Sequence, residues 1–177
     1  MSDATFGFYQ IYNNAQLPSY ATEQAACFDI RAHLIDPRGV TRHLQGVNEV
    51  GSNHYEFSTA LDDGAVYAIK PGHTMLIPTG LIAVMPSNYS LRIHLRSSMA
   101  LKRGLYLPNG EGVIDSDYFE ELYMMVRNGS RTDVEIVHGE RICQGEWVPV
   151  TQFPITSIHT RPQKSTNREG GFGSTGA

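Results

Sequence analysis

The amino-acid sequence predicts an all-β sandwich or barrel with one short helix, and three observations lead to this prediction. Apolar residues recur with a period of two, or in short uninterrupted runs, as they do in β-strands. Turn-forming residues interrupt these runs about every ten residues, a spacing typical of all-β domains. The chain of 177 residues is long enough for one domain with its own hydrophobic core.

The expected strands fall into two kinds. Residues 91–96 alternate apolar and basic side chains, and residues 133–137 alternate apolar and acidic ones, which indicates half-buried strands. Residues 74–77 and 122–126 are largely apolar, which indicates buried strands. A further strand is expected at residues 142–150.

One helix of about two turns is expected at residues 97–104. It starts with Ser97 and Ser98, continues with good helix formers and ends at Gly104. Proline, glycine and asparagine predict the turns between the strands. These turns are expected at residues 70–72, 78–80, 86–88, 108–110, 128–130 and 138–140.

Two regions depart from the strand pattern. Residues 34–66 are polar and irregular, so we expect an elaborated loop with a hairpin around residues 54–57. Residues 161–177 contain almost no core-forming side chains, and alone they would be mobile. The expected organisation is a β domain over residues 1–160 and a flexible, Gly-rich C-terminal lid over 161–177.

Composition excludes several classes of protein. The net charge of −4 argues against stable nucleic-acid binding, which needs a basic surplus. Neither a signal peptide nor an apolar run of about 18 residues occurs, so we expect no membrane span. Cys27 and Cys143 are far apart and are expected to be reduced thiols. The histidines lack zinc-site spacing, and no phosphate-binding P-loop or Ser-hydrolase elbow occurs.

Three segments carry residues that could do chemistry. Arg96, Ser97 and Ser98 follow a strand and begin the helix, a position that suits a phosphate chain or a simple helix cap. Residues 109–118 contain two glycines and two aspartates, which could approach a ligand and orient water, or could simply form a turn. In the tail, glycines surround Phe172, as expected of a lid that stacks on a flat ring or of a frayed terminus.

Taken in order, five segments resemble the motifs of the trimeric dUTP pyrophosphatase (dUTPase) family. The resemblance covers about residues 20–33 and 66–177, with the region 34–66 as an insertion. Five motifs in order with suitable spacing are far more specific than any one of them. The matching segments are residues 25–30, 96–100, 112–118, 139–144 and 170–176.

The resemblance implies a distorted jelly-roll or β-clip subunit that assembles as a threefold homotrimer, with active sites shared between subunits. It implies a dUTP diphosphatase that hydrolyses dUTP to dUMP and pyrophosphate by water attack on the α-phosphorus. Such an enzyme limits uracil in DNA and supplies dUMP for dTMP synthesis. The cofactor would be Mg²⁺, held through the triphosphate and waters with no direct protein ligand. The expected location is cytoplasmic or nuclear, in a cellular, viral or phage setting.

The resemblance also assigns catalytic and phosphate-binding roles. Asp115 would orient the attacking water, and Gln144 would fix water near the metal-bound triphosphate. Arg96, Ser97 and Ser98 would hold the phosphates, with Ser97 near the departing bridge oxygen.

The remaining roles concern the nucleoside and the lid. Tyr118 would pack on the deoxyribose, and Asp29 would brace the second motif. The uracil edge would be read by Asn109 and by the backbone of Gly112, Val113 and Ile114. In the lid, Phe172 would stack on uracil, while Arg168, Gly173, Ser174 and Thr175 would meet the phosphates.

The chain departs from the family pattern at several positions. The fifth motif usually begins with Arg where this chain has Asn167, and Arg168 follows one residue later. Glu120 and Cys27 replace usual glycines, and Arg127 stands where an apolar residue is common.

Two alternatives belong to other functional classes. A dCTP deaminase of the same fold needs a carboxylic acid where this chain has Met125, and a thioether cannot transfer protons. A dUTPase-like protein-binding regulator could use residues 34–66 as its contact surface. An inactive regulator would be expected to lose Asp115 or Gln144, and both are present. Strictness for dUTP over dCTP depends on pocket geometry and stays open at this point.

Overall fold

The computed structural model describes residues 5–42, 45–48, 52–53 and 66–167, and the described part is an all-β fold with one short helix. The predicted fold class is therefore confirmed. The strands are β1 (Gly7–Gln10), β2 (Ser19–Tyr20), β3 (Phe28–Arg31), β4 (Gln45–Asn48), β5 (Ser52–Asn53), β6 (Val66–Ile69), β7 (Thr74–Pro78), β8 (Leu81–Val84), β9 (Tyr89–Leu95), β10 (Leu105–Tyr106), β11 (Gly112–Ile114), β12 (Tyr123–Asn128), β13 (Val134–Val137) and β14 (Arg141–Pro149), with α1 (Ser97–Arg103) between β9 and β10.

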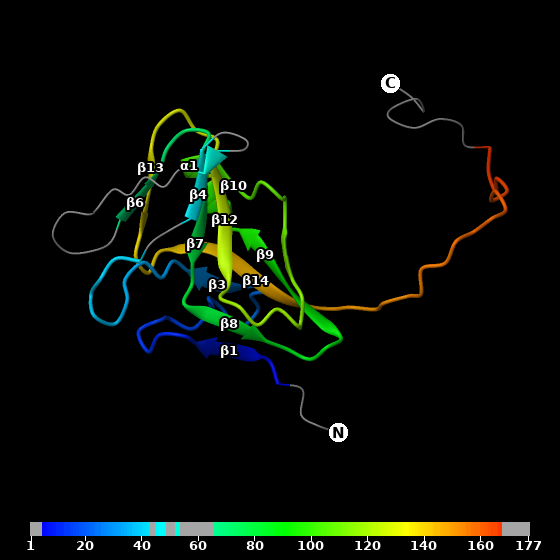
Figure 1. Cartoon of the computed structure of the whole chain (residues 1–177), viewed down its shortest axis with the longest axis horizontal. Coiled ribbons are helices and arrows are strands. Elements are labelled where there is room, and N and C mark those ends of the chain that lie inside the picture. Colours follow the sequence, from blue (N-terminus) through cyan, green and yellow to red (C-terminus); the bar gives the residue numbers. More distant parts are fainter. Residues whose placement is uncertain (1–4, 43–44, 49–51, 54–65, 168–177) are drawn as a thin grey trace.

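Two five-stranded antiparallel sheets form the body, in the orders β10-β12-β7-β4-β5 and β11-β9-β14-β3-β2 (Figure 1). Two small sheets, β1-β8 and β13-β6, flank them. Apolar side chains of both large sheets pack into one core, including Ile30 of β3 and Leu91 of β9 from one sheet and Ile77 of β7 and Met124 of β12 from the other. This jelly-roll-like arrangement buries the alternating apolar positions that the sequence predicts.

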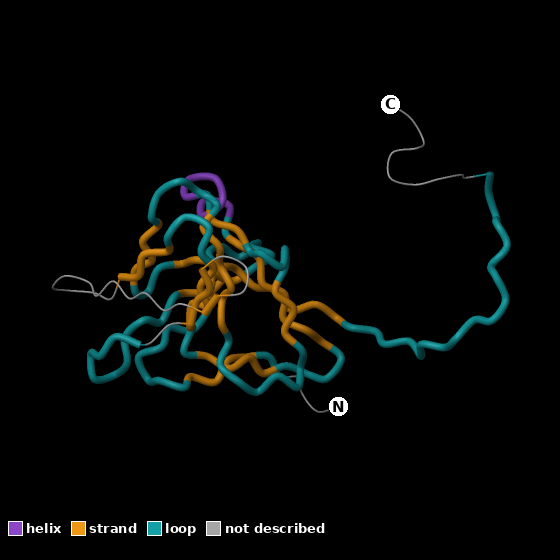
Figure 2. Tube along the Cα trace, turned by 45° about the horizontal axis from the view of Figure 1, so that its top comes forward, coloured by secondary structure: helices purple, strands orange, loops and turns teal. Residues whose placement is uncertain are grey.

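The predicted strands and the helix occur close to their expected positions, and Figure 2 shows α1 at one end of the strand framework. One expectation needs correction, because β12 is not buried on both faces. Met124 and Val126 are fully buried, whereas Tyr123 is 36% and Met125 38% exposed. The exposed pair lines a pocket.

Helix α1 begins and ends for different local reasons. Its N-cap is Arg96, with no side-chain hydrogen bond to the first turn, so Ser97 and Ser98 are the first helical residues and do not cap it. Gly104 ends the helix in the left-handed conformation at φ 66°, which a glycine adopts without strain. Lys102 and Arg103 in the last turn favour the negative end of the helix dipole. Within the described residues, no helix has the length and apolar character needed to cross a bilayer.

Within the region 34–66, the described residues include two short strands, β4 and β5, which the prediction of an elaborated loop did not specify. β4 pairs antiparallel with β7 and β5 pairs with β4. A bridge between Ile35 and Thr41 precedes them. Pairing with β4 satisfies backbone groups of β7 that would otherwise form a bare sheet edge, and this pairing depends little on side-chain type. The hairpin predicted around residues 54–57 lies outside the described residues.

A buried histidine lies beside this region. His33 is 2% exposed, and its Nε2 atom has no hydrogen-bond partner within the described residues. Its ring stacks on Tyr12 with centroids 5.3 Å apart. Burial, followed by the positive charges of Arg42 and His138, lowers the pKa of His33 from 6.5 to about 4. The folded protein therefore holds this imidazole neutral at pH 7.

Replacing His33 with phenylalanine is expected to make the protein less sensitive to acid. Because the folded pKa is lowered, the His33 contribution is complete above about pH 6.5 and is lost as the pH falls toward 4. The loss in unfolding free energy between pH 7 and pH 4.5 is on the order of 2 kcal/mol. Urea unfolding at several pH values checks this. The His33→Phe profile should be flatter than that of wild type. Equal steepness in the two proteins would contradict the prediction.

Candidate active site

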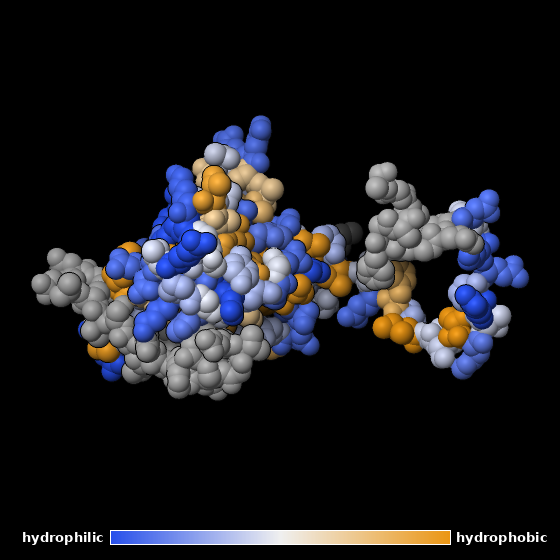
Figure 3. Space-filling view, turned by 90° about the horizontal axis from the view of Figure 1, so that it is seen from above, coloured by the Kyte–Doolittle hydropathy of each residue, from blue (hydrophilic) through white to orange (hydrophobic). Residues whose placement is uncertain are grey.

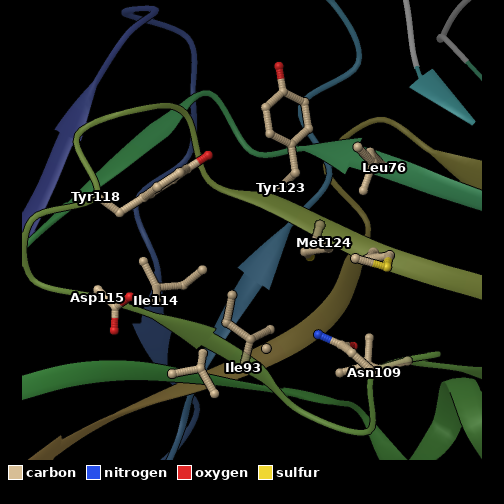
Figure 4. A pocket seen from close by; sticks show the side chains of 12 residues that line it. Leu76, Ile93, Asn109, Ile114, Asp115, Tyr118, Tyr123 and Met124 are labelled. Carbon is tan, nitrogen blue, oxygen red and sulfur yellow. The ribbon is translucent and has the colours of Figure 1, made fainter.

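The first of two pockets that concern function has a volume of about 340 Å³ and lies between β11, β12 and β7 (Figure 4). Figure 4 shows Tyr118 and Tyr123 at one rim, with Ile93 and Asn109 across the pocket from them. Apolar side chains form the walls and a few polar groups converge on them, as in sites for flat organic rings. Its lining is Leu76, Ile93, Leu107, Asn109, Gly112, Val113, Ile114, Asp115, Tyr118, Tyr123, Met124 and Met125.

Close backbone packing shapes this pocket. β11 pairs with β9, and Gly112 lies opposite Ile93. A Cβ atom at Gly112 would come 3.0 Å from Cβ of Ile93, so a side chain there would push the hairpin away from β9. The backbone N–H of Tyr118 donates to the Asp115 carbonyl at 3.1 Å, which closes the turn after β11.

The two tyrosines are held as neutral phenols. The Tyr118 hydroxyl donates to the Glu121 carbonyl at 3.0 Å, and the Tyr123 hydroxyl donates to the Glu121 carboxylate at 3.1 Å. Burial, followed by the negative charges of Glu120 and Glu121, raises the pKa of Tyr118. Burial and Glu121 likewise raise the pKa of Tyr123. Both hydroxyls therefore remain hydrogen-bond donors at neutral pH.

The second pocket, of about 430 Å³, lies where β9 ends and α1 begins. Gln144 of β14 enters it because it pairs with His94 of β9 on one side and Asp29 of β3 on the other. Two hydroxyls, an amide and a guanidinium converge here, a donor set suited to phosphate oxygens. Its lining is Ala21, Ala25, Ala26, Cys27, Asp29, Arg96, Ser97, Ser98 and Gln144.

Ion pairs fix the arginine of this pocket. Asp29 is 8% exposed, and its two carboxylate oxygens accept from Nε of Arg96 and from a terminal nitrogen of Arg141, each at 2.9 Å. Two guanidinium groups against one carboxylate leave a net positive charge beside the pocket, which favours an anion. Arg103 of α1 also pairs with Glu140, so the helix is tied to the turn before β14.

The sequence-predicted residues fall into two separate groups. Tyr118, Asp115, Asn109 and the β11 backbone line the first pocket, whereas Arg96, Ser97, Ser98, Gln144 and Asp29 line the second, and the two linings share no residue. The predicted lid residues Arg168, Phe172, Gly173, Ser174 and Thr175 lie outside the described residues.

Sequence reasoning assigned no role to several residues that the structure places at these pockets. Arg141 reaches the second pocket through its ion pair with Asp29, and its place within the fourth motif was the available signal. Leu76, Tyr123 and Met125 were counted as buried strand residues, because the period-two pattern does not show which face lines a pocket.

Three of the departures from the family pattern are accommodated in the fold. Cys27 lines the second pocket, and burial, followed by the charge of Glu146, raises the pKa of its thiol, which keeps it protonated. Glu120 is exposed at the turn before β12. Arg127 donates to the Thr74 hydroxyl at 3.2 Å across the β12–β7 pair.

A slot for a flat ring and an arginine-hydroxyl pocket define an all-β nucleotide-binding protein. The dUTPase family model matches residues 63–176. A relative from Dinoroseobacter shibae is 37% identical over 160 residues, covering 90% of this chain and 87% of the relative. A relative from Caulobacter vibrioides is 33% identical over 166 residues, covering 92% and 88%. Both are named deoxyuridine 5′-triphosphate nucleotidohydrolase. The chain belongs to the dUTPase family, which confirms the resemblance seen in its motifs.

Solved structures agree on the fold. The dUTPase of Streptococcus mutans superposes with a TM-score of 0.59 at 26% identity, covering 84% of this chain and 98% of that one. A dUTPase of Staphylococcus bacteriophage 80alpha, solved with dUpNHpp, gives a TM-score of 0.70 at 18% identity and covers 98% and 99%.

Proposed function

We propose that this chain is a dUTP diphosphatase, which hydrolyses dUTP to dUMP and pyrophosphate by attack of water on the α-phosphorus. The observation that carries the proposal is the pair of pockets. One offers an apolar slot for a base and a sugar, and the other offers Arg96, Ser97 and Ser98 to an anion. A deaminase is not favoured, because the side chain at the required position is Met125.

The active site is completed by a second and a third copy of the chain in a threefold homotrimer. The base pocket and the anion pocket have separate linings, and in the proposed trimer a nucleotide in one copy's slot would extend its phosphates to another copy's anion pocket. The segment after β14 leaves the body and carries apolar side chains into solvent (Figures 1 and 3). Phe153, Ile155 and Ile158 are 79%, 100% and 74% exposed in the single chain, as expected of an arm that packs on a neighbour.

The chemistry needs a positioned water and stabilised phosphates. Asp115 carries a carboxylate at the rim of the base pocket, where it would orient the water toward the α-phosphorus. Arg96 would stabilise charge that develops on the phosphates, and it is already held by Asp29. Ser97 would donate near the departing bridge oxygen, and Gln144 would hold a water beside the phosphates.

Selection of the nucleotide would come from fixed donors and from shape. Asn109 and the β11 backbone would pair with the uracil edge, so cytosine would leave a buried mismatch. Tyr118, packed against the deoxyribose, would exclude a 2′-hydroxyl. The lid residues, with Phe172 over the base and Ser174, Thr175 and Arg168 toward the phosphates, are proposed from the fifth motif alone.

Magnesium would be held by the triphosphate and water rather than by side chains of the anion pocket. Asp29 is the carboxylate of that lining, and both of its oxygens are already engaged by arginines. Among the described residues, no group of three histidine, cysteine or acidic side chains is placed to bind a metal ion. A cation held by phosphate oxygens and water suits Mg²⁺, which would neutralise charge on the triphosphate.

Hydrolysis should be confined to dUTP and should require magnesium. Pyrophosphate release from dUTP, dCTP, dTTP and UTP, measured in parallel with Mg²⁺ and with EDTA, tests the proposal. We expect turnover of dUTP at least about 100-fold above the other three, because a pocket rejects an added methyl or hydroxyl group by about this factor and a mismatched polar edge by more, and we expect loss of turnover in EDTA. Folded protein that cleaves none of the four would refute the enzyme proposal. Comparable cleavage of dCTP would refute the proposed selection of uracil over cytosine by the base pocket.

A further inference from the structure

Glu121 connects the two tyrosines of the base pocket. Its carbonyl accepts the Tyr118 hydroxyl, and one of its carboxylate oxygens accepts the Tyr123 hydroxyl, so both rings depend on one residue. The other carboxylate oxygen accepts the backbone N–H of Gly80 at 2.6 Å. The residue itself does not line the pocket.

Arg42 holds that carboxylate with two parallel hydrogen bonds. Its terminal nitrogens donate to the two oxygens of Glu121 at 2.7 and 2.6 Å, and both side chains are only 12% exposed. Burial alone would raise the pKa of Glu121, but the hydrogen bonds from Arg42 and Gly80 outweigh it and lower the pKa. The pair is therefore ionised at neutral pH, and its geometry needs a guanidinium.

Arg42 is itself fixed by contacts from three directions. Its guanidinium lies over the ring of Tyr12 at 4.9 Å and donates to the His33 carbonyl at 3.3 Å. Its backbone carbonyl accepts the Tyr67 hydroxyl, and its backbone N–H donates to Leu34 at 2.9 Å. These contacts hold both the guanidinium and the backbone of Arg42, and so fix one side of the Glu121 carboxylate.

We propose that the Arg42–Glu121 pair is the positioning element that sets Tyr118 and Tyr123 and thereby determines how strictly the base pocket excludes a ribonucleotide. This inference rests on the proposed function. Arg42 lies just before β4, so the region 34–66 would contribute to substrate selection through this one ion pair. Neither partner touches the nucleotide, and both act through the tyrosines.

Arg42→Lys keeps the charge but loses the paired geometry, and Glu121→Gln keeps the acceptor for Tyr123 but loses the charge. For each variant we expect KM for dUTP to rise about 10-fold over wild type while kcat stays within about twofold of the wild-type value. The preference for dUTP over UTP should also fall about 10-fold, the size expected for the loss of one contact in the pocket. Affinity for dUMP, measured by titration calorimetry, should fall in parallel.

The control is Arg38→Ala in the same segment. Arg38 pairs with Asp36 at 2.7 Å, is 81% exposed and contacts no residue of the pocket. It should match wild type in KM, nucleotide preference and dUMP affinity. Urea unfolding of all three variants at the assay temperature establishes that each is folded. If Arg42→Lys does not fold, Glu121→Gln alone tests the proposal with the same measurements.

Folded variants with unchanged KM, nucleotide preference and dUMP affinity would overturn the inference and leave the pair a purely structural contact. A larger fall in kcat than in affinity would also overturn it. Wild-type protein that binds dUMP without hydrolysing dUTP would instead refute the proposed function. The dUMP affinities of the variants would then still show whether the Arg42–Glu121 pair positions the two tyrosines. Wild-type protein that does neither would refute both.

Discussion

Replacing Asp115 with asparagine is expected to lower kcat for dUTP by about 10²–10⁴-fold, the range for loss of a positioned proton acceptor. Asparagine fills the same space but carries no charge and cannot take a proton from water. The base pocket keeps its shape, so KM for dUTP and affinity for dUMP should change little. Steady-state kinetics and dUMP titration separate the two effects.

Asp117→Asn provides a matched control two residues away. Asp117 is exposed on the same hairpin turn and does not line the base pocket, so the same substitution there should leave kcat near the wild-type value. An Asp115→Asn protein that retains more than about a tenth of the wild-type kcat would contradict the water-orienting role. Equal losses in both variants would point to general damage to the hairpin.

Two inactive variants should restore activity when they assemble together. Asp115→Asn damages the base pocket and Arg96→Ala damages the anion pocket, and these pockets share no residue. If a site joins one pocket from each of two copies, every mixed ring of three has about one third of its sites with both pockets intact. Co-expressed, differently tagged chains purified through both tags should therefore recover a substantial part of wild-type dUTP turnover.

The control for this experiment combines two lesions in one pocket. Asp115→Asn mixed with Asn109→Ala damages the base pocket of every copy, so no site with an intact base pocket can form in any arrangement. Recovery in both mixtures would indicate residual activity of the variants rather than shared sites. Absence of recovery in the first mixture, with mixed assembly shown by the two tags, would place each site within a single chain and contradict the trimeric arrangement proposed above.

Local sequence patterns determined most of the secondary structure. The alternation at residues 91–96 became β9, with Leu91 and Ile93 buried, because a strand turns successive side chains to opposite faces. Gly104 ends α1 as expected, because a left-handed residue there disfavours any side chain. These outcomes depend on neighbouring residues alone. The motif spacing was likewise enough to identify the family.

The division of the site between two pockets was decided by tertiary structure. The partners Asp29 and Arg141 are 112 positions apart in the chain, and Arg42 and Glu121 are 79 apart, so no local pattern brings them together. The pairing of β4 with β7 could not be predicted from the sequence either. Backbone hydrogen bonds can form a strand from a polar segment whose side chains suggest a loop. Sequence alone thus determined the elements, the motifs and the family. Only the folded chain decided which motifs share a pocket, because that depends on strand order and register between distant segments.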